Sequence, residues 1–165
     1  MICGDDDEKT PTTNPYPAPV PPAPDRRALA TTAAVNEIGN GDPKKYWDDV
    51  LPGVNVGHAD WCGAGALWSL HQAGLALDRK WTIGRGFILV GPHPLPTTKT
   101  PLPGDIAYFN RNQHQAVVVG VEGDLVQLVN FNGTAGKVSP STIHKSQATA
   151  FFSIEPLLHV PTGNA

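Results

Sequence analysis

The sequence has few of the residues that build disulfide scaffolds, metal clusters and nucleic-acid-binding surfaces. It contains only two cysteines, Cys3 and Cys62, among 165 residues, too few for a disulfide framework or a four-ligand zinc site. Charged residues make up only 16% of the chain, and the formal net charge of −3 provides no cationic surface. No apolar run reaches the roughly 18 residues that a membrane-spanning helix needs. We therefore expect neither a nucleic-acid partner nor a transmembrane segment.

An acidic cluster and a proline-rich tract occupy the N-terminal part of the chain. The segment CGDDDEKTPTTNPYPAPVPPAP contains little that can be buried, so residues 1–24 are expected to be a disordered linker outside the fold. Cys3, followed by glycine and aspartates, resembles the mature start of a bacterial lipoprotein and is a candidate lipid anchor. The alternative is an incidental cysteine in a tail. Residues 159–165 are expected to be a second flexible tail, which leaves one domain, residues 25–158.

Helical signals precede strand signals along this domain. We expect three helical segments: one from an Asp25 N-cap to a stop at Gly39 and Gly41, a short turn around Tyr46 and Trp47, and a helix from about Trp61 to Ala73 capped by Asp60. Segments with strand patterns follow at 87–90, 103–109, 114–131 and 148–155, and a Glu-Gly-Asp turn at 122–124 divides the third into a hairpin. This order predicts an α+β domain whose N-terminal helices pack on an antiparallel β-sheet.

The stretch ADWCGAGALWSL (59–70) places Cys62 in the first turn of the third predicted helix. Unpaired backbone N–H groups and the helix dipole favour a thiolate there, which predicts a lowered pKa for Cys62, although the carboxylate of Asp60 would partly oppose this. The glycines and alanines that follow allow the helix to lie close against a sheet. The alternative is a buried structural cysteine.

A cysteine nucleophile needs an imidazole that accepts its proton and a polar group that holds the imidazole in place. Among the six histidines, His114 stands out because it opens the strand HQAVVVG. Across the predicted turn follow Asn130 and Asn132, two residues apart and therefore on one face of the strand. The expected register places His114 opposite Asn132, whose carbonyl would accept the Nδ1–H of the ring. The alternative is that both asparagines belong to an ordinary turn.

These segments together resemble a known family. ALATTAAVNEIGNGDPKKYWDDV and ADWCGAGALWSLHQAGL resemble an N-terminal helix followed by a nucleophile helix, PLPGDIAYF resembles a Pro-Gly-Asp strand, and QHQAVVVGVEGDLVQLVNFNG resembles a histidine strand with its Asn-Gly motif. In this order they are similar to the papain-like CHAP superfamily (cysteine, histidine-dependent amidohydrolase/peptidase) of cell-wall amidases and peptidases, and to the related NlpC-type enzymes. The resemblance covers most of residues 28–133.

The resemblance implies a papain-like fold and a cysteine hydrolase that cleaves an amide bond in peptidoglycan. Cys62 corresponds to the nucleophile, His114 to the general base, and Asn132, with Asn130 as the second choice, to the residue that orients the base. No metal or organic cofactor is implied.

The residues around the nucleophile complete the expected site. Papain has an oxyanion glutamine before its cysteine, which this chain lacks, so the backbone N–H of Cys62 would serve, helped by Asn55 or His58. The expected substrate-binding residues are Trp61, Gly63 and Gln115.

Several biological settings suit such an enzyme. It could be a phage lysin or virion-associated protein, a secreted antibacterial toxin with an immunity or inhibitor protein as partner, or a wall-remodelling hydrolase of the cell envelope. Two alternatives to a peptidoglycan hydrolase remain open: a non-catalytic module that binds peptidoglycan or a protein on the same fold, and a cysteine peptidase directed at proteins.

Overall fold

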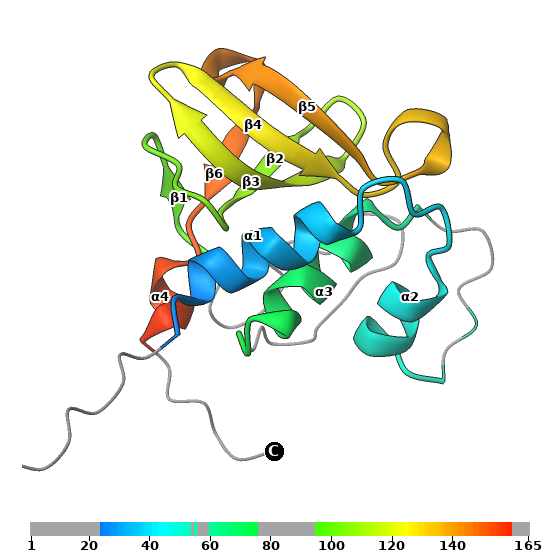
Figure 1. Cartoon of the computed structure of the whole chain (residues 1–165). Helices are drawn as coiled ribbons and strands as arrows, with labels where there is room; N and C mark the ends of the chain where they lie inside the picture. The colour runs from blue at the N-terminus through cyan, green and yellow to red at the C-terminus, as the bar shows by residue number, and fades with distance from the viewer. Residues whose placement is uncertain (1–23, 54, 56–59, 76–94, 160–165) are drawn as a thin grey trace, which may run out of the picture.

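The computed structural model describes residues 24–53, 55, 60–75 and 95–159, which form helices beneath a curved antiparallel sheet (Figure 1). The predicted strand at 87–90 and nearly all of the two expected tails, including Cys3, lie outside the described residues. The described part is mixed helix and strand, which confirms the α+β class.

The first helices form where local signals predict them. Helix α1 (Arg26–Asn36) begins after Asp25, whose carboxylate accepts hydrogen bonds from the backbone N–H groups of Arg27 and Ala28 and so acts as the predicted N-cap. The predicted turn around the Tyr-Trp pair is α2 (Lys44–Val50). A short helix, α4 (Glu155–Leu158), is the last element of the described residues. None of the helices in the described ranges combines the length and the apolar character needed to cross a membrane.

Helix α3 (Cys62–Gln72) has nearly the predicted bounds but not the predicted cap. Trp61 occupies the N-cap position and makes no capping hydrogen bond with its side chain. The Asp60 carboxylate instead accepts a hydrogen bond of 3.0 Å from the Nδ2 of Asn132. The prediction of Asp60 as N-cap was therefore wrong, because a tertiary contact has replaced the local one.

The six strands form one antiparallel sheet in the order β1-β6-β2-β3-β4-β5. Their bounds are β1 (Thr97–Thr98), β2 (Ile106–Phe109), β3 (His114–Glu122), β4 (Leu125–Asn130), β5 (Ser139–His144) and β6 (Ala150–Phe152). The predicted hairpin is confirmed, with Gly123 at a positive φ of 57° in its turn. Strands β1 and β5 were not predicted, and the last predicted strand is shorter because α4 follows it.

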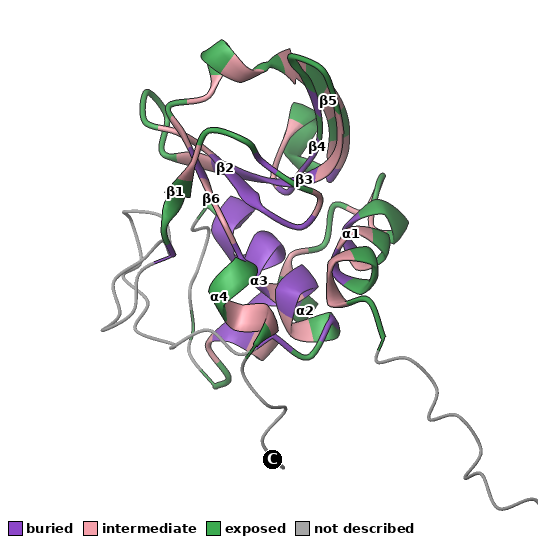
Figure 2. Cartoon of the chain, turned by 90° about the vertical axis from the view of Figure 1, so that its left-hand side faces the viewer, coloured by how far each residue is buried: buried purple, intermediate pink, exposed green. Residues whose placement is uncertain are grey.

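The strands in the middle of the sheet, β2, β3 and β4, are coloured largely as buried in Figure 2, and the two faces of the sheet bury different sets of side chains. One face packs on the helices, and Val117, Val129 and Phe131 lie there in a core with residues of α1, α2 and α3. The other face lies inside the curve of the sheet and holds a second cluster, made of Ala107, Ala116, Val118, Val126, Leu128 and Phe151. We call these the helix face and the inner face.

Helix α3 lies close to the sheet because its first turns lack bulky side chains. A Cβ atom added at Gly65 would overlap the ring of Phe131, which follows β4 and is fully buried. The expectation that small residues allow a close approach is therefore confirmed, and this approach brings the start of α3 next to the start of β3.

A buried ion pair fixes α1 to the sheet and to α4. Arg27 donates to Asp105 at 2.9 Å and to Glu155 at 2.9 Å, and only 1% of the Asp105 side chain is exposed. Asp105 also accepts hydrogen bonds from the backbone N–H groups of Leu102 and Ile154, so its carboxylate joins three segments that are far apart in the chain.

Candidate active site

Cys62 is the first residue of α3, and 7% of it is exposed. Three backbone N–H groups favour the charged form of its sulfur: those of Gln115, Gly63 and Cys62 itself. The Gln115 group belongs to β3 and directly follows His114 in the chain. The sulfur therefore lies beside the first residues of β3, where the predicted base is located.

Burial raises the pKa of the Cys62 thiol above its ordinary value. The three backbone N–H groups lower this pKa and the nearby Asp60 carboxylate raises it, but burial is the largest cause. The predicted lowering of the pKa by the helix terminus was wrong, because desolvation of the thiolate outweighs the donors of the first turn. The resting side chain is a protonated thiol, and it needs a base to become a nucleophile.

His114 is held by Asn130. The Nε2 of His114 lies 3.0 Å from the Oδ1 of Asn130. The Nδ2 of Asn130 donates to the backbone oxygen of Ser139 and to the Oγ of Ser141, which fixes the amide with its oxygen toward the ring. Because Oδ1 only accepts, Nε2 carries the hydrogen and Nδ1 is the basic nitrogen. The prediction that Nδ1–H would donate to the asparagine is therefore corrected.

Burial lowers the pKa of His114, and this effect exceeds the opposing effects of the Asn130 hydrogen bond and of the Asp60 charge. The imidazole is therefore neutral at neutral pH and able to accept a proton. The neutral thiol of Cys62, on α3, and the neutral imidazole of His114, on β3, are both near the start of β3. Transfer of a proton from the thiol to the imidazole is the step that would create the nucleophile.

The structure prefers Asn130 over Asn132, the reverse of the predicted order. Ala116 pairs with Asn130, so His114 reaches Asn130 along a diagonal of the inner face. Strand β4 ends at Asn130, and Asn132 has a φ of 52°, so its backbone has already left the strand. Phe131, between the two asparagines, is fully buried, and its ring contacts Tyr46 and Trp61 on the helix face.

Asn132 still belongs to this neighbourhood through its hydrogen bond to Asp60. The Asp60 carboxylate is close enough to both Cys62 and His114 to shift the pKa of each upward. Asp60 was expected only as a cap, and no sequence pattern identifies it as a neighbour of the base, since the contact depends on where the chain leaves β4.

The residues predicted to bind substrate lie below the surface. Gly63 and Gln115 are buried, and only 6% of Trp61 is exposed, with its ring stacked on Tyr46 at 5.4 Å. They support the site rather than line an open surface. Of the two predicted oxyanion residues, Asn55 is exposed, and His58 lies outside the described residues.

Gln115 has an unusual environment. Its side chain is fully buried, and neither its Nε2 nor its Oε1 has a hydrogen-bond partner among the described residues. An amide left in this state costs roughly 1–3 kcal/mol. Its side chain lies on the strand face opposite to that of His114, and its backbone N–H is the group beside the Cys62 sulfur.

A pocket of about 640 Å³ opens on the inner face beside the His114–Asn130 pair. Its lining residues are Phe109, Asn110, Arg111, Asn112, His114, Asn130, Ser141, Ile143, Gln147 and Thr149. Cys62 does not line it. In the described ranges no three histidine, cysteine or acidic side chains gather as a metal site would require.

Comparison of the chain with family models, with curated proteins and with solved structures gives no match.

Proposed function

We propose that this protein is a papain-like cysteine hydrolase of the CHAP type that cleaves an amide bond in bacterial peptidoglycan. One observation carries the proposal: the sulfur of Cys62 is directed at the backbone N–H of Gln115, while the preceding residue, His114, is oriented by Asn130. A buried thiol, a neutral imidazole and a fixed amide in this order are the groups that Cys-His-Asn catalysis uses.

The proposed reaction begins with transfer of the Cys62 thiol proton to Nδ1 of His114 as the sulfur attacks the amide carbon. A carbon–sulfur bond forms, and the backbone N–H groups at the start of α3 stabilise the oxyanion. The carbon–nitrogen bond then breaks, and the imidazolium of His114 gives its proton to the leaving amine. Water, deprotonated by the same ring, hydrolyses the acyl-enzyme and restores the thiol. Asn130 accepts from the Nε2–H throughout, so the proton is exchanged at Nδ1 only.

The substrate class follows from the resemblance of the motifs. The same resemblance supports a secreted, envelope or virion-associated location, with an immunity protein as a further proposal. A lipid anchor at Cys3 is proposed from the lipoprotein-like residues around that cysteine. No metal or organic cofactor takes part in the proposed reaction.

Digestion of purified peptidoglycan with mass spectrometry of the soluble muropeptides tests the proposal. The wild-type protein should release new fragments with one added water per cut, and Cys62→Ser should release none. Cys3→Ser is the matched control, because it changes the other cysteine and should retain activity. Peptidoglycan left intact by the folded wild-type protein would refute the proposal, and cleavage of casein instead would support a peptidase directed at proteins.

A non-catalytic binding module is the second candidate, and the burial of Cys62 favours it. Since burial raises the pKa of the thiol, slow alkylation by iodoacetamide at neutral pH would occur in either case. Turnover separates the two: a binding module sediments with insoluble peptidoglycan equally well as wild type and as Cys62→Ser, and neither protein releases fragments.

A further inference from the structure

The pocket on the inner face is the strongest feature that the proposed reaction does not use. It opens on the inner face, and Phe109 and Ile143, which pack against the inner-face cluster, provide its apolar surface. His114 and Asn130 line it, whereas the nucleophile does not. The pocket therefore lies on the side of the catalytic base.

Several polar side chains around the pocket have hydrogens left to donate. The Oγ of Ser141 accepts from Asn130, and the Oγ1 of Thr149 accepts from the backbone N–H of Asn110 at 2.9 Å. Among the described residues neither hydroxyl donates in return. Gln147 uses its Oε1 to accept from the His144 backbone, which leaves its Nε2 hydrogens for a ligand.

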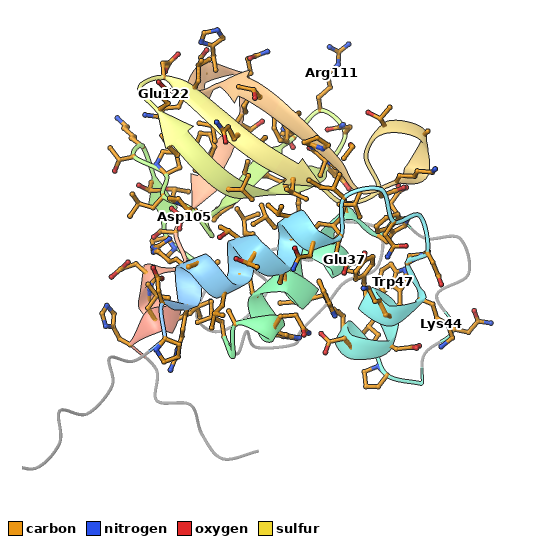
Figure 3. The ribbon with its side chains drawn as sticks, viewed as in Figure 1. Glu37, Lys44, Trp47, Asp105, Arg111 and Glu122 are labelled. Atoms are coloured by element: carbon orange, nitrogen blue, oxygen red, sulfur yellow. The ribbon has the colours of Figure 1, made fainter. Side chains whose placement is uncertain are left out.

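The pocket lining carries positive charge and no negative charge. Arg111, on the loop between β2 and β3 (Figure 3), is the only fully charged side chain in the lining, and no carboxylate lines the pocket. Arg111 is exposed and makes no ion pair with a described residue. A guanidinium beside hydroxyl and amide donors is the recognition pattern for a carboxylate, which accepts up to four hydrogen bonds.

We propose that this pocket binds the amine half of the substrate and selects a half that carries a free carboxylate. The inference rests on the proposed function: the acyl half is bonded to Cys62, whereas the amine that leaves is protonated by His114, and the pocket lies on the His114 side. The occupant is therefore a peptide segment with its amino end at His114 and a carboxylate near Arg111, with the donors of Ser141 and Thr149 along its backbone.

Binding to a Cys62→Ala protein tests the pocket without turnover. The probe is the dipeptide alanyl-glutamate, which has a free amine and two carboxylates, and the matched probe is alanyl-glutamine amide, which lacks both negative charges. Titration followed by two-dimensional ¹⁵N NMR should give saturable shifts in the backbone signals of Asn110, Arg111 and Thr149. The amidated probe should bind at least tenfold more weakly.

Variants of the same protein locate the charge and the cavity. Arg111→Gln should weaken binding of alanyl-glutamate about tenfold, whereas Lys99→Gln, which removes an equal charge from an exposed site outside the pocket, should leave it unchanged. Ile143→Trp, which fills the cavity, should abolish binding of both probes. Absence of saturable shifts, equal binding of the two probes, or shifts confined to residues outside the lining would overturn the proposal.

The two proposals fail in different ways. If wild-type protein cleaves peptidoglycan but the Cys62→Ala protein binds neither probe, the carboxylate pocket is refuted and the hydrolase stands. If the charged probe binds as described but wild-type protein cleaves nothing, the pocket stands as a binding site and the hydrolase is refuted.

Discussion

The helix face and the inner face of the sheet differ in how completely they are closed. On the helix face, α1, α2 and α3 cover the strands, and the ring of Tyr46 contacts three other aromatic rings there, those of Trp61, Trp68 and Phe131. On the inner face the apolar cluster is smaller, and a pocket opens beside it.

This difference divides the candidate site between two environments. Cys62 comes from the closed helix face, where burial keeps its thiol protonated, and His114 comes from the inner face, where Asn130 and the pocket surround its ring. Both lie near the start of β3, because the Cys62 sulfur is beside the backbone N–H of Gln115, the residue that follows His114. A closed face is suited to holding a nucleophile still, and an open face to admitting a substrate. Changes on the inner face should therefore cost activity, and changes on the helix face should cost stability.

The largest expected effect is on the inner face. His114→Gln removes the basic nitrogen while keeping a polar side chain that can donate to Asn130, and it should lower kcat/KM on peptidoglycan by about 10²–10⁴, the usual contribution of a general base. The melting temperature should stay near that of wild type. His144→Gln, at an exposed histidine paired with Asp124, is the control and should keep full activity. Equal activity of both variants would contradict the assignment of the base.

The largest expected effect on stability is at the ion pair between Arg27 of α1 and Asp105, which precedes β2. Asp105→Ala leaves Arg27 without its buried partner and two backbone N–H groups without an acceptor. Loss of one member of a buried pair costs about 3–5 kcal/mol of unfolding free energy. Urea denaturation should show this loss, whereas Asp124→Ala, at an exposed pair, should change stability by less than about 1 kcal/mol.

Close packing of α3 gives the next effect. Gly65→Ala places a methyl group in the space of the Phe131 ring and should cost about 1–3 kcal/mol of unfolding free energy. Phe131→Leu in the same chain should recover part of this loss, because it removes the overlapping ring atoms. A double-mutant cycle by urea denaturation measures the recovery, and strict additivity of the two changes would contradict the contact.

The two asparagines provide a smaller but sharper comparison. Asn130→Ala releases the ring of His114 and should reduce kcat about tenfold or more. This loss is smaller than that of removing the base itself, because the imidazole is still present but no longer held in one orientation. Asn132→Ala removes only the hydrogen bond to Asp60 and should reduce kcat less. Steady-state rates on a soluble muropeptide decide between them, and a larger loss at Asn132 would restore the order expected from sequence.

The smallest effect is on the pH profile. Because burial lowers the pKa of His114 and the reaction needs its neutral form, kcat/KM should fall only as the pH drops below about 6.5, the ordinary value for histidine. Asn130→Ala removes a hydrogen bond that raises this pKa, so its acid limb should move to still lower pH. If kcat/KM already began to fall at a pH higher than 6.5 as the solution was made more acidic, the ring would not be the buried neutral group described here.

Local signals were sufficient for much of the fold. The N-cap at Asp25, the bounds of α3 and the hairpin of β3 and β4 all follow from residues adjacent in the chain. Strand β5 (SPSTIH) was missed because an edge strand with alternating half-burial carries little apolar signal. The cap of α3 was predicted wrongly because Asp60 bonds to Asn132, which lies far along the chain.

The sequence by itself determined the order of helices and strands, the identity of the candidate thiol and base, and a choice between two asparagines. The tertiary structure decided which asparagine holds the ring, which ring nitrogen is basic, and that the thiol rests protonated. The reason is physical: capping and periodicity act between near neighbours, whereas burial and the departure of the chain at Phe131 exist only once helix and sheet have packed together.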